Sequence, residues 1–179
     1  MRLLHTTTHQ LEHFISQDQA PPYAILSHTW GPDEVIFKDL HSGELSYKLK
    51  QGWRKIVASA LYAANNGWQY IWIDTCCIDK SDITELSEAI NSMFRWYEGA
   101  QICYAYLADV PAPLPQPAHP WNWSFRSSRW FTRGWTLQEL LAPTFLEFLD
   151  SDWNSIGSRE EWAAEIQVAT GIRAKQLGL

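Results

Sequence analysis

The chain has 179 residues, 46% of them apolar, and a formal net charge of −6 at pH 7. This length and apolar content predict one domain with a substantial core. The acidic balance argues against nucleic acid as a partner, because proteins that hold phosphate backbones cluster lysine and arginine. No apolar run reaches the roughly 20 residues of a membrane span, and the N-terminal sequence lacks the apolar stretch of a secretory signal.

The three cysteines, Cys76, Cys77 and Cys103, do not form the disulfide framework of a small secreted protein. Together with the missing signal, they predict a cytoplasmic protein in a reducing compartment. Adjacent Cys76 and Cys77 lack the spacing of zinc ligands, so no metal site is expected.

Strands and helices alternate in the first half of the sequence. Residues 23–27 form a short apolar run typical of a buried strand. Residues 53–66 repeat apolar side chains at helical spacing, and Gly67 follows as a stop. Aromatic and β-branched residues at 70–74 predict a second strand.

A second helix is expected after Asp82, because Asp82 and Glu85 have the spacing of a capping box. The side chains expected to face the core from this helix are Leu86, Ala89, Ile90, Met93 and either Trp96 or Tyr97. A third strand is expected at 102–107, and a proline-rich segment follows at 111–120. This segment is typical of a stiff surface loop or, alternatively, of a ligand for another protein.

The second half continues the alternation with a helix at 135–142, a strand at 145–149 and a helix at 159–170. Strands that alternate with helices imply an α/β fold with a parallel sheet covered on both faces. Residues 171–179 continue a helix-forming pattern, so we expect the single domain of residues 1–179 to be an N-terminal fragment of a longer multidomain protein.

Three stretches resemble the sequence blocks of fungal heterokaryon-incompatibility (HET) domains, in the same order. They are YAILSHTWG at 23–31, YIWIDTCCID at 70–79 and RGWTLQEL at 133–140. The opening residues 1–4 also look like the start of HET domains placed at the N-terminus of NLR-type or ankyrin-bearing fungal proteins. The resemblance implies a fungal self/non-self recognition module that triggers cell death, with a sensor domain downstream in the full-length chain.

A more distant resemblance links the chain to TIR domains that cleave NAD. Their catalytic glutamate lies on the helix after the third strand, in a pattern of serine, tryptophan and then Glu-Leu. Here Ser128 precedes Trp135, and Glu139 and Leu140 follow at the TIR spacing, with Thr136 in place of the cysteine common in TIR domains. The resemblance implies a flavodoxin-like or TIR-like fold that hydrolyses NAD, or a related nucleotide, with Glu139 as the catalytic residue.

Elementary chemistry agrees with this role for Glu139. Trp135 is four residues earlier, so on a helix both side chains lie on one face and the ring can form a wall beside the carboxylate. Loss of nicotinamide from the ribose builds oxocarbenium character, which a carboxylate stabilises. The alternative is a helix-surface glutamate in a salt bridge. Neither common nucleotide-binding fingerprint, G-x-G-x-x-G or G-x-x-x-x-G-K-[ST], is present, so NAD is expected as a substrate and not as a redox cofactor.

The substrate is expected at the carboxyl edge of the sheet, where open α/β sheets bind ligands. Ser27, His28 and Thr29 end the first predicted strand, while Asp74 and Cys76 follow the second. His28 is alternatively a hydrogen-bonded structural residue, and Asp74 is alternatively a carboxylate that caps a loop.

Trp30 and Gly31 are expected to shape a loop over this cleft, with glycine allowing close backbone approach. Arg133 suits a phosphate of the dinucleotide, although an internal ion pair is an equal alternative. A nucleophilic pair of Cys76 and His28 is a further alternative, but no oxyanion motif accompanies it and a buried cysteine usually only packs.

A rival hypothesis makes the chain a non-enzymatic module that signals by homotypic assembly and recruitment. Trp121 and Trp123, beside the proline-rich segment, would then be aromatic anchors of an interface. Self-association is also compatible with catalysis, since TIR-like enzymes often complete their site by assembling.

Overall fold

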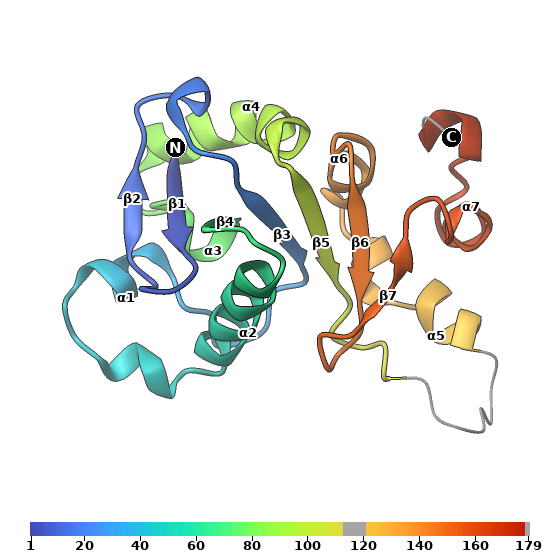
Figure 1. Cartoon of the computed structure of the whole chain (residues 1–179), viewed down its shortest axis with the longest axis horizontal. Coiled ribbons are helices and arrows are strands. Elements are labelled where there is room, and N and C mark those ends of the chain that lie inside the picture. Colours follow the sequence, from blue (N-terminus) through green and yellow to red (C-terminus); the bar gives the residue numbers. More distant parts are fainter. Residues whose placement is uncertain (113–120, 178–179) are drawn as a thin grey trace.

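A mixed β-sheet runs through the described part of the molecule in the order β2-β1-β4-β3-β5-β6-β7 (Figure 1). The computed structural model describes residues 1–112 and 121–177. The strands are β1 (Arg2–His5), β2 (Leu11–His13), β3 (Ala24–His28), β4 (Tyr70–Ile73), β5 (Ile102–Tyr106), β6 (Leu146–Leu149) and β7 (Ser155–Ser158).

The four central strands, β4, β3, β5 and β6, are parallel, as the sequence predicts. Numbered along the chain, they lie side by side in the order 2-1-3-4, which is how a flavodoxin-like sheet begins. In such a sheet the connections leave in opposite directions from the first and third strands. A crevice therefore opens between the carboxyl ends of β3 and β5.

The sheet is not parallel throughout, and this corrects the sequence-based expectation at both edges. β1 pairs antiparallel with β2 and β4, and β7 pairs antiparallel with β6. These added strands are only three or four residues long. Each of them contains only one or two apolar residues, too few to form the apolar run that marks the equally short central strands β4 and β6.

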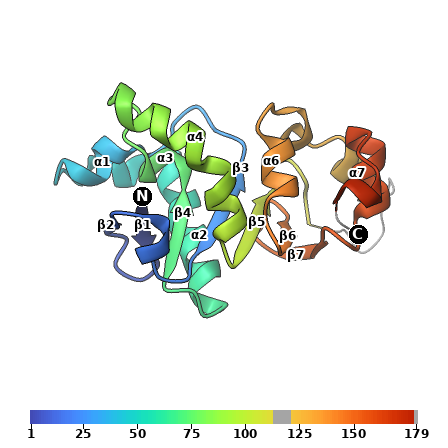
Figure 2. The same ribbon diagram turned by 90° about the horizontal axis from the view of Figure 1, so that it is seen from above.

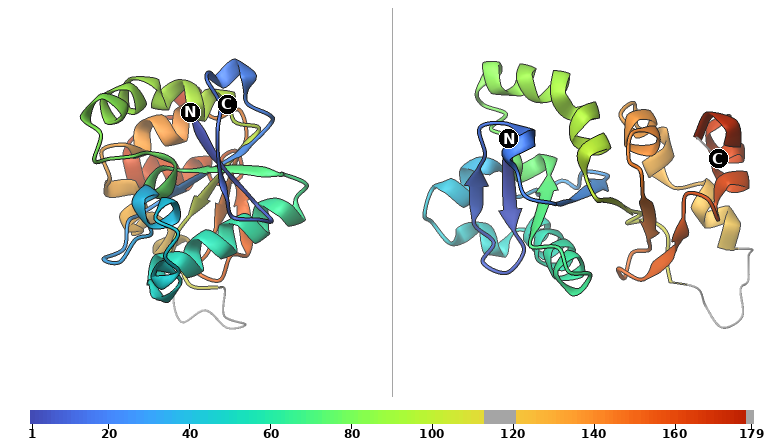
Figure 3. Two further views of the ribbon diagram at one scale, coloured as in Figure 1. Left: turned by 90° about the vertical axis from the view of Figure 1, so that its left-hand side faces the viewer. Right: turned by 45° about the horizontal axis from the view of Figure 1, so that its top comes forward.

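Helices cover both faces of the sheet. α2 (Gln51–Asn65) lies against one face, and α4 (Ile83–Gly99) and α6 (Thr136–Leu141) lie along the other (Figures 2 and 3). The remaining helices are α1 (Phe37–His41), α3 (Asp74–Cys77), α5 (Trp121–Arg126), α7 (Ala163–Thr170) and the 3-10 turns η1 (Gln17–Gln19), η2 (Ser46–Leu49), η3 (Arg129–Thr132) and η4 (Ala174–Leu177).

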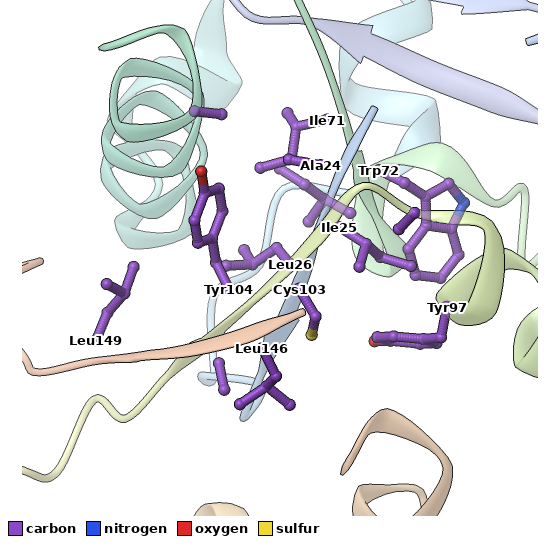
Figure 4. Close-up of a cluster of buried hydrophobic side chains, with 14 of the residues drawn as sticks. Ala24, Ile25, Leu26, Ile71, Trp72, Tyr97, Cys103, Tyr104, Leu146 and Leu149 are labelled. Atoms are coloured by element: carbon purple, nitrogen blue, oxygen red, sulfur yellow. The ribbon is translucent and has the colours of Figure 1, made fainter. Parts of the chain in front are cut away.

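Strand register explains which side chains meet which helices. Ile25 is aligned with Trp72 on one side and with Cys103 on the other, so these three side chains share a face. The Trp72 ring lies 6.0 Å from the ring of Tyr97 on α4. Tyr104, one position along from Cys103, points to the opposite face, toward α2 (Figure 4).

Two predicted helix boundaries are confirmed in their physical detail. Gly67 follows α2 with φ +88°, a left-handed conformation that glycine adopts without strain. The Asp82 carboxylate accepts hydrogen bonds from the backbone N–H groups of Thr84 and Glu85 at 2.9 and 3.2 Å. The capping box is not completed, because the Glu85 carboxylate accepts instead from the backbone N–H of Asp79.

Other predicted elements shift. The last long helix starts at Ala163 rather than 159, because residues 159–162 form a turn that follows the edge strand β7. Gly171, with φ +78°, ends α7, so the continuous helical pattern expected over 171–179 is wrong in the described part. Of the proline-rich segment, residues 113–120 lie outside the described residues. No helix in the described ranges has both the length and the apolar character that crossing a bilayer requires.

Candidate functional site

Glu139 is a buried carboxylate, with its side chain only 4% exposed. It lies on α6 and reaches the carboxyl end of β3, where the Ser27 hydroxyl donates to its Oε2 at 2.6 Å. The Arg133 guanidinium donates to both carboxylate oxygens, at 2.8 and 2.9 Å. The Trp130 indole N–H donates to Ser27 Oγ at 2.7 Å, which holds that hydroxyl toward the carboxylate.

This arrangement sets the charge and the remaining hydrogen-bonding capacity of Glu139. Burial raises the pKa of the Glu139 carboxyl, and the Arg133 guanidinium and the Ser27 hydroxyl oppose that rise. A carboxylate has about four lone-pair positions. Ser27 and Arg133 use three of them, so Oε1 retains one position for a further donor.

Glu139 lies at a cleft of about 460 Å³ on the carboxyl edge of the sheet. Its lining combines residues after β3 and β4 with residues of α4 and α6, namely Thr29, Trp30, Asp74, Met93, Tyr97, Arg133, Gly134, Trp135 and Glu139. Trp30 and Trp135 are 50% and 46% exposed, so two aromatic rings of the lining are accessible from solvent. Six residues predicted for the site from the sequence therefore meet in one place: Glu139 with Thr29, Trp30, Asp74, Arg133 and Trp135.

Asp74 organises one wall of this cleft. Its Oδ2 accepts from the Trp30 indole N–H at 2.9 Å and from Lys80 Nζ at 3.3 Å. The same Lys80 ammonium lies 3.5 Å from the centre of the Trp30 ring. Asp74 thus fixes Trp30 by hydrogen bonding and by placing a cation on its face, a role different from the loop cap considered as its alternative.

His28 is buried beneath the cleft, with no hydrogen bond to either ring nitrogen among the described residues. Its Nε2 lies 3.7 Å from Asp74 Oδ1. Burial, reinforced by the nearby charges of Lys55, Arg133 and Lys80, lowers the pKa of His28 well below its usual value. The imidazole is therefore neutral, and the hydrogen-bonded structural histidine considered as an alternative is not what the structure contains.

Cys76 and Gly31 do not line this cleft. Cys76 is fully buried in α3, and its thiol faces the backbone carbonyl of Ile73 at 3.8 Å. The hydrogen bond with Cys77 and burial raise the pKa of Cys76 well above its usual value, which disfavours the thiolate that a nucleophile needs. Gly31 lines a neighbouring cleft, and a methyl group at its Cα would make only ordinary contact with Glu34, so close approach does not require glycine there.

Ser128, the serine of the TIR-like pattern, lies elsewhere. It caps η3 by accepting from the Trp130 N–H, and it donates to Asp109 at 2.7 Å. The serine that meets Glu139 is Ser27, which the sequence predicted only through its place at the end of a strand.

Sequence reasoning missed several members of the site. Trp130 had no signal, because one tryptophan among eleven has no distinguishing spacing. Met93 and Tyr97 were assigned to a core stripe on the helix, and the structure places both on the cleft wall as well. Lys80 could have been suspected only from its position six residues after Asp74.

The comparisons with known proteins identify the family. Residues 23–113 match the family model described as heterokaryon incompatibility protein (HET). The chain belongs to the HET family. Within the matched segment lie Ser27, His28, Asp74 and Cys76, whereas Arg133 and Glu139 follow it.

A curated HET relative extends the comparison along the chain. Vegetative incompatibility protein HET-E-1 of Podospora anserina is 52% identical over 161 residues, which cover 88% of this chain. The same alignment covers 12% of the relative, so the chain spans about one eighth of that protein's length. No solved structure matches the chain.

Proposed function

We propose that this HET domain is an effector of heterokaryon incompatibility that kills the cell by hydrolysing NAD, with Glu139 as the catalytic residue. Family membership and the name of the Podospora relative support the biological role. The observation that most supports the proposed reaction is the buried Glu139 carboxylate, held by Ser27 and Arg133 at a cleft lined by aromatic side chains.

In the proposed reaction, water adds to the anomeric carbon of the nicotinamide ribose as the C–N glycosidic bond breaks. Nicotinamide leaves as a neutral molecule with the bonding electron pair, and the proton lost from water passes to solvent. The products are nicotinamide and ADP-ribose. Positive charge that develops on the ribose ring is stabilised by the negative Glu139 carboxylate, whose remaining lone pair on Oε1 accepts a ribose hydroxyl.

The positions of the side chains fit this proposal. Trp30 and Trp135, which both line the cleft and are partly exposed, offer flat apolar surfaces for the nicotinamide ring. Arg133 opposes the rise in the pKa of the buried Glu139 carboxyl and so favours its ionised form. We further propose that a sensor domain elsewhere in the full-length protein activates this HET domain by clustering it.

The decisive test follows nicotinamide release by chromatography after incubating artificially clustered protein with NAD. Glu139→Gln preserves side-chain shape and removes the charge, and we expect it to lower the rate by at least a hundredfold. Glu98→Gln, on the exposed surface of α4, is the matched control and should retain the wild-type rate. Equal release by the wild type and a folded Glu139→Gln variant would refute the mechanism.

A second candidate function, signalling by assembly without catalysis, is favoured by exposed apolar side chains beside the cleft. Ile90 and Phe94 on α4 are 43% and 46% exposed, and Leu137 on the adjacent α6 is 53% exposed. Trp123, predicted as an interface anchor, is 64% exposed, whereas the Trp121 side chain lies outside the described part of the structure.

The two functions differ in their response to mutation. If assembly alone triggers death, Phe94→Ser abolishes killing in cells and Glu139→Gln does not. If NAD hydrolysis is required, Glu139→Gln abolishes killing even when cross-linking shows that the variant still assembles.

A further inference from the structure

A second cleft opens on the other side of Trp30. It has a volume of about 350 Å³ and shares Thr29 and Trp30 with the cleft that contains Glu139. Its other walls come from the loop after β3, the carboxyl end of β5, the turn after β6, the first turns of α2 and Arg129 of η3. This is the crevice between β3 and β5, where the strand order reverses and where flavodoxin-like sheets bind ligands.

One wall of the second cleft is a pair of stacked aromatic rings. The rings of Tyr106 and Trp153 lie 4.1 Å apart and within 10° of parallel. The Tyr106 hydroxyl donates to the backbone carbonyl of Ser151 at 3.1 Å, so both rings are tied to the same turn. A flat, partly exposed indole on such a stack is a platform for another flat ring.

The turn that carries Trp153 is constrained in a costly conformation. Trp153 has φ +65°, which residues other than glycine rarely adopt. The fully buried Asp150 carboxylate holds the turn by accepting from the backbone N–H groups of Asp152 and Asn154, both at 2.9 Å. Backbone strain of this kind persists only where the surroundings enforce it, and it gathers at ligand sites.

The charges of the second cleft favour an anion. Both acidic side chains of the cleft already accept hydrogen bonds from the protein. The Asp33 carboxylate accepts from the backbone N–H of Gln51, and the Glu34 carboxylate accepts from the Lys55 ammonium and the backbone N–H of Gly31. Arg129 is 69% exposed and lies 3.5 Å from Asp109, a longer contact than a tight ion pair. Arginine in this setting suits phosphate oxygens, which it binds through a planar fork of donors.

We infer that the second cleft binds the adenosine diphosphate half of a dinucleotide, with the adenine on Trp153 and the phosphates near Arg129. The inference rests on the proposed function, because it divides one substrate between two clefts that share Trp30. In this arrangement the ribose that loses its base lies against Glu139. The pyrophosphate linkage of the substrate crosses the edge of the sheet beneath Trp30.

The test uses ADP, which lacks the nicotinamide ribose, and calorimetric titration of the whole chain. We expect ADP to bind the wild type and Glu139→Gln with equal affinity. Trp153→Gly removes the ring and suits the positive φ, and Arg129→Ala removes an exposed charge; each should weaken ADP binding at least tenfold. Arg95→Ala, an exposed arginine on α4, is the matched control and should bind as the wild type does.

The outcomes separate this inference from the proposed reaction. ADP binding that depends on Trp153, without any NAD cleavage, supports the proposed ligand site in the second cleft and refutes the proposed reaction. Cleavage that depends on Glu139, with no ADP binding and with an unchanged KM in Trp153→Gly, retains the reaction and overturns the inference. Trp153→Phe, which keeps an aromatic ring, should recover most of the affinity if stacking is the cause.

Discussion

The Glu139 carboxylate combines two interpretations that the sequence presented as alternatives. It is in a salt bridge, as a structural glutamate would be, but the bridge is buried and lies at a cleft. Arg133 likewise forms the internal ion pair that competed with phosphate binding. Sequence spacing could place Arg133 and Glu139 near one another, six residues apart, but not Ser27, which lies 112 residues earlier.

His28 predicts how stability depends on pH. The pKa of His28 in the folded protein lies well below the value of about 6.5 that an unfolded chain gives. Between these two values the unfolded state binds the proton and the folded state does not. The stability contributed by the neutral imidazole is therefore complete above about pH 6.5 and is lost as the pH falls below it.

We expect the free energy of unfolding to fall by up to about 1.4 kcal/mol per pH unit below pH 6 through this residue. Urea unfolding at pH 7, 6 and 5 measures the slope. His28→Gln should reduce the slope, whatever its effect at pH 7, and His13→Gln on the edge strand β2 should leave it unchanged. Equal slopes in all three proteins would contradict a neutral, buried His28.

At the scale of elements, the sequence predicted the parallel strands and the long helices because each carries its own signal. Apolar runs mark β3 and β4, and Asp82 and Gly67 mark the ends of α4 and α2 through local backbone chemistry. The edge strands were missed because each contains only one or two apolar residues and so carries no apolar run of its own. One of their pairings also joins distant segments, since β1 pairs with β4 almost 70 residues later.

The loop between β3 and α1 illustrates a constraint that only the structure reveals. Gly52 lies so close to this loop that a Cβ atom would come within 2.7 to 2.8 Å of the backbone of Val35, Asp33 and Glu34. Its own N–H donates to the Asp33 carbonyl at 2.9 Å. The φ of Gly52 is not in the left-handed region, so the need for glycine comes from this packing and not from a turn. Such packing leaves no local pattern in the sequence that would distinguish Gly52 from the other glycines.

Gly52→Ala should therefore destabilise the fold by about 1–3 kcal/mol, since backbone atoms must move to admit the methyl group. Urea denaturation of the variant measures the cost. Gly134→Ala is the matched control, with no atom within 4 Å of the new methyl group and a change expected within about 0.5 kcal/mol. A Gly52→Ala variant as stable as the wild type would show that the loop is not packed as described.

At the scale of the whole molecule, one sheet and one hydrophobic core link both halves of the chain. β5 joins the N-terminal strands to β6, and the same core cluster contains Leu3 near one end and Ile166 near the other. The expected single domain of 179 residues should therefore unfold in one cooperative transition.

Urea unfolding followed by far-ultraviolet circular dichroism and by tryptophan fluorescence tests this expectation. The two curves should coincide in midpoint and steepness. Transitions that separate would mean that the part carrying β6, β7 and α7 unfolds independently of the rest. Leu3→Ala and Ile166→Ala serve as controls. If each substitution shifts both unfolding curves by the same amount, the two ends of the chain belong to one cooperative unit.

The three cysteines allow local opening of the structure to be measured by thiol labelling. All are buried, Cys76 and Cys77 beside β4 and Cys103 in the central strand β5. A thiol so enclosed reacts with an alkylating reagent only when the surrounding structure opens, so its labelling rate measures the free energy of that opening. Labelling of Cys77 and Cys103, resolved by mass spectrometry, would map the stability of two neighbouring regions without an introduced probe.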